Sequence, residues 1–135
     1  MIKITDKPLS PELVVSEVKT DSSGCVLAYI GLIRGLSHDK PVLSVEYQDT
    51  KGTAEASLRQ IASEVRQKWP INNIAIYHRV GKLNVGDINL VVAVACAHRK
   101  EAFAACQYVV DRFKQVMPTH KRETYQDGSI LVEGE

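Results

Sequence analysis

At 135 residues, 44% hydrophobic and 24% charged, the chain is long and apolar enough for one globular domain, which we expect to span residues 1–135. Seventeen Lys and Arg against sixteen Asp and Glu leave a formal net charge of +1, which excludes the strongly cationic field of a typical nucleic-acid-binding protein. No apolar run reaches the ~18 residues of a membrane span and no signal-peptide core precedes the domain, so we expect a cytoplasmic protein.

The first half of the chain predicts one short helix among strands. Ser10 is a favourable N-cap and Pro11 suits the first helical position. Residues 25–33 are apolar on both faces, which is typical of a central buried strand. The predicted elements are an edge strand at 2–4, a helix at 11–18, the strand at 25–33 and a half-buried strand at 42–48. Between the two long strands, residues 36–41 predict a polar, mobile loop.

The second half contains two longer amphipathic helices. Apolar residues recur at helical spacing over 53–69 and over 99–117. A proline, Pro70 or Pro118, closes each run because it cannot continue a helix. The other predicted elements are a strand at 74–79, a hairpin-like excursion at 81–87, a long strand at 88–96, and a terminal hairpin over 121–132 with a primed turn at Asp127-Gly128. Helices and strands that do not simply alternate predict an α+β fold with a mixed, largely antiparallel sheet.

The cysteines Cys25, Cys96 and Cys106 form an odd set without a CxxC motif. Such a set argues against a disulfide framework or a zinc knuckle, so we interpret the three as small core residues. Cys96 and His98 are two positions apart, but nothing else has the spacing of metal ligands. We therefore predict neither a metal nor another cofactor.

Basic side chains gather in the sequence DRFKQVMPTHKRE, from Asp111 to Glu123. Lys114 lies beside the apolar stripe of the second long helix, where its stem can pack on the core while its amine faces a cleft. Lys121 follows Pro118 on an extended segment. These two lysines are the best candidates for catalysis. A solvated basic helix end, favourable next to the C-terminal dipole, is the alternative.

Three further basic residues stand just after predicted strands. His98 and Arg99 lie where the strand at 88–96 gives way to a helix, whose unpaired N–H groups and positive dipole favour a phosphate or carboxylate. Arg34 follows the strand at 25–33. The alternative for each is an exposed residue or a surface salt bridge.

The length of the helix at 99–117 raises a geometric problem. Arg99 and Lys114 are fifteen residues apart, so their Cα atoms are ~22 Å apart at ~1.5 Å per residue. Two side chains do not meet across that distance. If both ends of the helix serve one site, one end comes from each subunit of a two-fold dimer. We therefore predict a homodimer with two composite sites.

Several short motifs follow one another between Cys25 and Val132. They are GLIRG at 31–35, VEYQ at 45–48, KWP at 68–70, YHRVGKLNVGD at 77–87, AHRKEAFAACQYVVDRFK at 97–114, and P-x-x-KRE at 118–123 followed by Asp127-Gly128. Each motif alone is weak. In this order and spacing they resemble the large, catalytic subunits of molybdopterin synthase, the MoaE family.

The resemblance implies a sulfurtransferase that converts cyclic pyranopterin monophosphate to molybdopterin by inserting two sulfurs as an ene-dithiolate. The sulfur is expected to arrive as a thiocarboxylate on the C-terminal Gly-Gly of a small ubiquitin-like subunit. The implied assembly is a heterotetramer around a homodimer, without nucleic acid or membrane. The implied fold is α/β-hammerhead-like, with two main helices and an added hairpin region.

The resemblance also assigns residues. Lys114 and Lys121 match the family's two essential lysines, and we expect Lys114 to act as general acid/base and charge stabiliser while Lys121 orients the thiocarboxylate. Arg34, His98 and Arg99 match positions that anchor the cyclic phosphate and pterin. The whole predicted substrate-binding set is Leu32, Ile33, Arg34, His98, Arg99, Lys114, Lys121, Arg122 and Glu123.

The sequence departs from the family pattern at three places. Thr119-His120 stand where the family usually has an aromatic residue before the second lysine. The loop after Arg34 lacks a common glycine, and Thr50 and Thr53 replace a tyrosine and a methionine.

Three other functions stay open. The same basic patch fits a non-catalytic module that binds a phosphorylated small molecule or RNA, although the near-zero net charge argues against RNA. A persulfide sulfurtransferase would need a cysteine for its chemistry. A purely structural subunit would tolerate the loss of both lysines.

Overall fold

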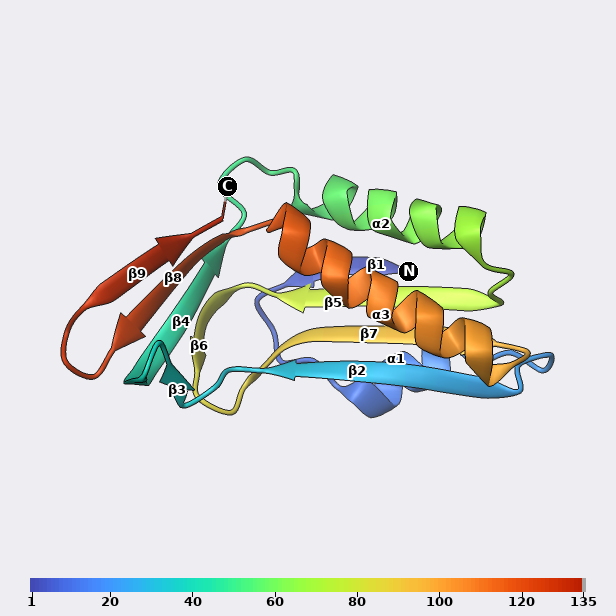
Figure 1. The fold of residues 1–135 in the computed structure, drawn as a ribbon, viewed down its shortest axis with the longest axis horizontal. Coiled ribbons are helices and arrows are strands. Elements are labelled where there is room, and N and C mark those ends of the chain that lie inside the picture. Colours follow the sequence, from blue (N-terminus) through green and yellow to red (C-terminus); the bar gives the residue numbers. More distant parts are fainter. Residues whose placement is uncertain (135) are drawn as a thin grey trace.

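Two β-sheets and three helices make up the fold in the computed structural model, which describes residues 1–134 (Figure 1). The helices are α1 (Pro11–Val18), α2 (Ala54–Lys68) and α3 (Arg99–Val116). The strands are β1 (Ile2–Thr5), β2 (Cys25–Leu32), β3 (Leu36–Ser37), β4 (Lys40–Gln48), β5 (Asn73–Arg79), β6 (Gly81–Asn84), β7 (Ile88–Cys96), β8 (His120–Tyr125) and β9 (Ile130–Glu133). This arrangement confirms the predicted α+β class, its two main helices and the terminal hairpin.

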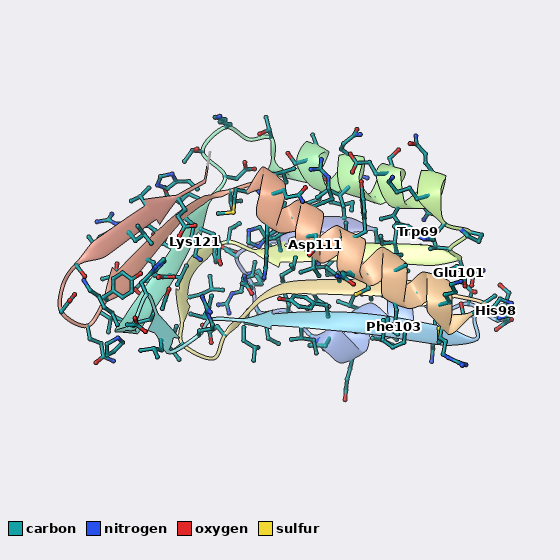
Figure 2. All side chains as sticks on the ribbon, in the orientation of Figure 1. Trp69, His98, Glu101, Phe103, Asp111 and Lys121 are labelled. Carbon is teal, nitrogen blue, oxygen red and sulfur yellow. The ribbon has the colours of Figure 1, made fainter. Side chains whose placement is uncertain are left out.

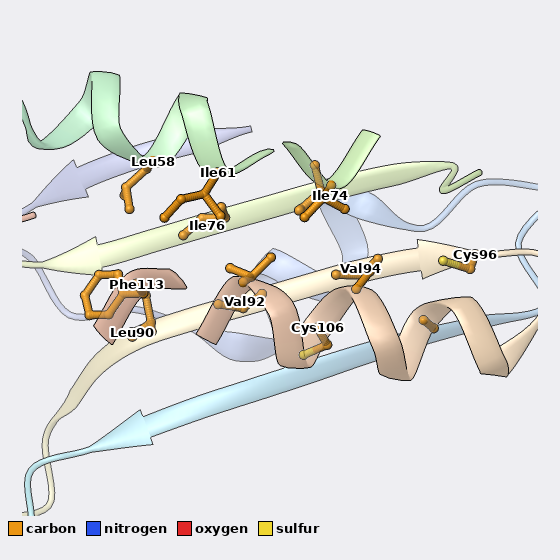
Figure 3. Close-up of a cluster of buried hydrophobic side chains, with 14 residues drawn as sticks. Leu58, Ile61, Ile74, Ile76, Leu90, Val92, Val94, Cys96, Cys106 and Phe113 are labelled. Atoms are coloured by element: carbon orange, nitrogen blue, oxygen red, sulfur yellow. The ribbon is translucent and has the colours of Figure 1, made fainter. Parts of the chain in front are cut away.

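The first sheet has four strands in the order β1-β5-β7-β2, with β1 parallel to β5 and the other neighbours antiparallel. Helices α2 and α3 cover one face and α1 covers the other (Figure 1). Alternate residues of β7 face opposite sides of the sheet. Val92 and Val94 pack under α2 and α3 (Figure 3), while Val91 and Ala93 pack on α1. Burial on both faces explains the continuous apolar run of this strand.

The prediction that residues 25–33 form a central strand is wrong. Strand β2 lies at the edge of the sheet, and two of its apolar side chains, Ile30 and Leu32, are 44% and 56% exposed. An apolar run predicts a strand with apolar side chains on both faces. It does not show which strands pair with that strand, because pairing depends on residues far away in the sequence. The inner strands are β5 and β7, each paired on both edges.

The second sheet has five strands: β3-β4-β8-β9 in this order, and β6, which also pairs with β4. Its core contains Val45, Tyr47, Leu83 and Tyr125. Because β6 pairs with β4 and not with β7, the predicted hairpin-like excursion at 81–87 is instead a crossing from one sheet to the other.

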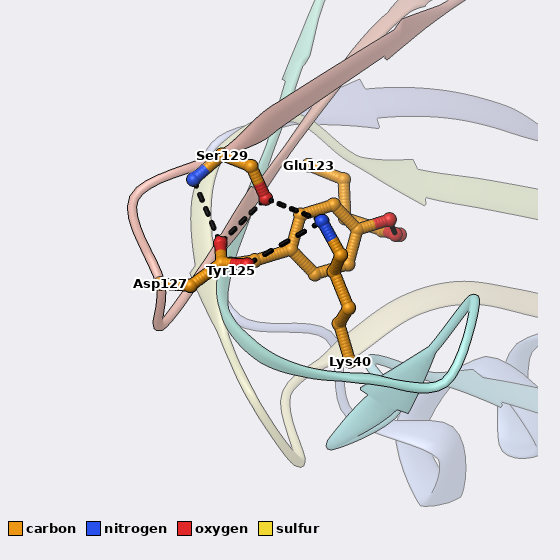
Figure 4. A network of polar contacts seen from close by, with 5 residues as sticks. All are labelled: Lys40, Glu123, Tyr125, Asp127 and Ser129. Carbon is orange, nitrogen blue, oxygen red and sulfur yellow. Dashed lines mark hydrogen bonds and ion pairs between the residues drawn. The ribbon is translucent and has the colours of Figure 1, made fainter.

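The tip of the terminal hairpin is held to the start of β4 by Lys40 (Figure 4). Its Nζ lies 3.4 Å from Asp127 Oδ2 and donates a hydrogen bond to Ser129 Oγ at 3.1 Å. The same ammonium lies 5.5 Å from the centre of the Tyr125 ring. These contacts fix β8 and β9 against β4.

Both predicted turn conformations need correction. Residues 36–41 are a tight hairpin and not a loop, with His38 and Asp39 at φ 51° and 61°, as a type I′ turn requires. At the terminal hairpin, Gly128 N donates to Tyr125 O at 3.0 Å, and Gly128 (φ 87°) has positive φ whereas Asp127 does not. That turn is therefore unprimed and followed by a left-handed glycine.

None of the helices in the described chain is both long and apolar enough to cross a membrane.

Candidate functional site

A groove of about 740 Å³ opens where the end of β2, the end of α3 and the start of β8 meet. Arg34, Lys114 and Lys121 all line it. A smaller hollow of about 50 Å³ shares Arg34 and Lys121 with the groove and adds Ile33 and Glu123 to its lining. Three predicted cationic residues from separate parts of the sequence thus meet at one surface. Glu133 is the acidic residue among the groove's lining.

The floor of the groove depends on a glycine in β2. A Cβ on Gly31 would lie 2.7 Å from Asn89 Oδ1, so the glycine lets the Asn89 side chain lie against the strand. Asn89 Nδ2 donates to the Tyr47 hydroxyl at 3.1 Å, and within the described chain its buried Oδ1 has no hydrogen-bond partner. Both side chains line the groove.

A sharp reversal of the chain brings the two lysines to the same groove. Helix α3 ends at Val116, and its C-cap Met117, with a left-handed φ of 45° and an N–H bond to Phe113 O, closes the last turn before Pro118. This confirms the predicted helix end. Lys114 is exposed in that last turn, while Lys121 follows on β8 with 24% of its side chain exposed. Residues 117–119 are therefore the hinge that sets the relative position of the two lysines.

Lys121 is paired with a buried carboxylate. Its Nζ lies 3.6 Å from Glu123 Oε2, two residues along β8 and on the same face. Burial by itself raises the pKa of Glu123, but hydrogen bonds from Tyr125 and Ser37 and the Lys121 ammonium more than offset this, so the pKa lies below its usual value. Glu123 is thus an anion at neutral pH, and it holds the Lys121 ammonium at the wall of the groove.

His78 lies directly beneath this region, on the face of β5 that packs on α3. It is fully buried, with Nδ1 2.8 Å from the carbonyl oxygen of Asn89 and Nε2 2.9 Å from Thr119 Oγ1. A carbonyl only accepts, so Nδ1 carries the proton and Nε2 accepts from the Thr119 hydroxyl. Burial lowers the pKa of His78 to about 4, although the hydrogen bond to Asn89 favours the protonated form.

The buried imidazole predicts a stability that depends on pH. The unfolded histidine titrates near 6.5 and the folded one at about 4, so the unfolded state binds more protons between these values and stability falls as the pH falls. We expect a loss of about 2 kcal/mol in the free energy of unfolding between pH 7 and pH 5. Urea unfolding at a series of pH values measures it. In His78→Gln the slope in this window should disappear, and an unchanged slope would show that other groups cause it.

His98 and Arg99 do not join the groove. Both are exposed: His98 is the N-cap of α3 and Arg99 is its first residue, at the opposite end of that helix from Lys114. Figure 2 labels His98 at this end, away from Lys121. Arg122 is exposed and alternates to the other face of β8, outside both hollows. The substrate-binding roles of these three residues stay predictions.

Several residues that line the groove were not predicted as site residues from the sequence. Tyr29, Tyr47, Asn89 and Glu133 line it, and Ser37 and His38 come from the segment predicted as a loop. Asn89 had a signal, because it is an amide in an otherwise apolar strand. The others come together only through strand pairing. No group of three or more His, Cys, Asp or Glu side chains within residues 1–134 is placed to hold a metal ion.

Comparison with known proteins identifies relatives of this chain and of its fold. The family model described as "MoaE protein" matches residues 4–116. A molybdopterin synthase catalytic subunit from Nostoc sp. is 42% identical over 127 residues, which cover 93% of this chain and 77% of that protein. The crystal structure of molybdopterin synthase from Staphylococcus aureus has a TM-score of 0.89 at 31% identity and covers 98% of this chain and 96% of its own.

A more distant structure, from Helicobacter pylori, has a TM-score of 0.77 at 14% identity and covers 99% of this chain and 90% of its own. It is described as a complex of subunits 1 and 2 of molybdopterin-converting factor. At this identity the likeness shows the fold alone.

The fold and the close relatives define the class of protein: a catalytic subunit of molybdopterin synthase, an enzyme of molybdenum cofactor biosynthesis. The chain belongs to the MoaE family. The resemblance drawn from the sequence motifs is therefore confirmed.

Proposed function

We propose that the groove is where sulfur is transferred to cyclic pyranopterin monophosphate, with Lys114 and Lys121 as catalytic residues. The observation that carries this proposal is the convergence of Arg34, Lys114 and Lys121 on one groove of about 740 Å³. This volume is within the ~300–1,000 Å³ of small-molecule sites. A phosphorylated heterocycle matches its size and its charge.

The chemistry suits fixed cations. Transfer of sulfur from a thiocarboxylate to a carbon of the pterin side ring develops negative charge, which ammonium groups held in place stabilise without reorganisation. Lys121 is held by Glu123, so it orients the thiocarboxylate. Lys114 lacks such a clamp among the described residues and lies in the last helical turn, where it acts as general acid/base and charge stabiliser.

The sulfur donor is a small ubiquitin-like subunit whose C-terminal Gly-Gly ends in a thiocarboxylate. The mouth of the groove supports an extended tail of this kind: Ile30 and Leu32 expose apolar surface on the free edge of β2, and the cations lie beyond them. The Helicobacter pylori chain has the same fold and is described as part of a complex of subunits 1 and 2, which also supports a partner. Free cysteines fit a cytoplasmic location.

His98 and Arg99 reach the substrate from a second copy of the chain. Helix α3 is continuous from Arg99 to Val116, so ~22 Å separates Arg99 from Lys114 within one chain. A homodimer at the centre of a heterotetramer brings the first turn of one α3 to the groove of the other chain. Each composite site then has Arg34 and the lysines from one copy and the His-Arg pair from its partner. Leu32, Ile33, Arg122 and Glu123 complete the proposed set.

Co-expression with a candidate small subunit ending in Gly-Gly tests this function. The purified complex, supplied with cyclic pyranopterin monophosphate and a thiocarboxylated partner, should form the ene-dithiolate product, which mass spectrometry detects. The control is a partner with an ordinary C-terminal carboxylate, which should give none. Tight complex formation without product would contradict the proposal and favour a non-catalytic subunit.

Sulfur transfer through a cysteine persulfide predicts a different outcome. Burial raises the pKa of Cys106 to about 11 and also raises that of Cys96. Neither of these two cysteines therefore has much of the reactive thiolate form at neutral pH. None of the described residues that line the groove is a cysteine. We expect the variant Cys25→Ala/Cys96→Ala/Cys106→Ala to retain turnover within about twofold of wild type, provided that circular dichroism shows it folded. A folded triple variant without turnover would favour the persulfide route.

A further inference from the structure

The side chain of His78 contacts residues of α3, β4 and β7 and the 117–119 segment that links α3 to β8. Its ring is edge-on to Phe113, the residue before Lys114, with centroids 5.0 Å apart. It is also edge-on to Tyr47, the residue opposite Lys121 in the β4–β8 ladder, at 4.9 Å. Its two nitrogens are bound to Asn89 of β7 and to Thr119 of the hinge at 117–119.

The Thr119 bond is the contact that fixes the hinge. Thr119 is 2% exposed, and its hydroxyl donates to the one nitrogen of His78 that still has a free lone pair. Only Pro118 and Met117 separate Thr119 from α3, and only His120 separates it from Lys121. A shift at Thr119 therefore moves Lys121 directly and changes the direction in which β8 leaves the helix.

We propose that His78 and Thr119 act together as positioning residues, which fix the geometry between Lys114 and Lys121 through one buried hydrogen bond. This inference rests on the proposed function of the two lysines and adds residues to which neither the motifs nor the comparisons give a role. Neither side chain lines the groove, so both act through the lysines and do not touch the substrate.

A histidine that only fills the core is the competing explanation, and the contacts distinguish the two. A core-filling role would be satisfied by the rings of Phe113 and Tyr47 and by the Asn89 carbonyl. The hydroxyl of Thr119 adds little volume over a methyl group, so its removal by valine keeps the packing while it deletes the bond. A positioning role predicts an effect on the lysines, whereas a packing role predicts none.

The test compares Thr119→Val with Thr119→Ser, which retains the hydroxyl, and with Thr124→Val on β8 as the matched control. In uniformly ¹³C,¹⁵N-labelled protein, NMR reports the ring nitrogens of His78 and the Cε–Hε signals of Lys114 and Lys121. We expect Thr119→Val to shift the Nε2 signal and both lysine signals, and the other two variants to leave them at wild-type positions. With a saturating thiocarboxylated partner, Thr119→Val should lower kcat by about tenfold with KM within about twofold.

The outcomes separate the two proposals. Lysine signals that stay in place when Nε2 shifts would overturn the positioning role, as would wild-type kcat in a folded Thr119→Val protein. If the wild-type protein gives no turnover but the lysine signals move in Thr119→Val, the proposed function fails while the coupling between His78 and the lysines stands.

Discussion

Alanine at Lys114 or at Lys121 is expected to lower the turnover of the reconstituted enzyme by about 100-fold or more. Each change removes a fixed positive charge from the groove where negative charge develops. Product formation under saturating partner and substrate measures the effect on kcat. The matched control is Lys82→Ala, an exposed lysine on β6 outside the groove, which should keep wild-type turnover.

The two lysine variants should differ in stability. Lys114 is exposed, so its loss leaves the fold unaffected. Loss of Lys121 leaves the buried carboxylate of Glu123 without its cation, which we expect to cost about 1–3 kcal/mol. The double variant Lys121→Ala/Glu123→Gln should regain that stability but not the turnover. Wild-type turnover in either single alanine variant would contradict the catalytic assignment.

Much of the fold could be predicted from the sequence because local signals were strong. The helices were placed by apolar spacing, by Ser10 before α1 and by Pro118 after α3. The terminal hairpin followed from two short strands around Asp127-Gly128. What local signals do not contain is the order of strands in a sheet. Two apolar runs, now β2 and β7, could equally be central, and only long-range pairing placed β2 at the edge.

The turns show the same limit on a smaller scale. His38 and Asp39 adopt the primed conformation without a glycine, while Asp127-Gly128, the usual sequence for it, does not. The register of the flanking strands decides how many residues each turn must contain, and that register is set by side chains elsewhere in the sheet.

The site was predictable where its residues carry chemistry. Lys114, Lys121 and Arg34 could be singled out as cations at element ends, and they meet at the groove. Tyr47 and His78 could not, because each looks like an ordinary strand residue until strand pairing brings it beneath the lysines. Asn89 carried a signal as an amide in an apolar strand, but only strand pairing brings it to Tyr47. His98 and Arg99 were also singled out from the sequence, but within one chain they lie far from the groove.

The second large effect is expected at the composite site, where Arg99 of one copy and Lys114 of the other meet. Arg99→Ala and Lys114→Ala should each be inactive as homodimers. In a heterodimer of the two variants, one site combines both changes while the other receives an unchanged Arg99 from one copy and an unchanged Lys114 from its partner. Activity should therefore return on mixing, although neither parent is active.

The rate of that heterodimer, isolated with two different affinity tags and assayed with a saturating thiocarboxylated partner, tests the composite site most directly. Sites built from two copies predict about half the wild-type rate, since one of two sites is intact. A heterodimer as inactive as its parents, or a chain that stays monomeric, would contradict it.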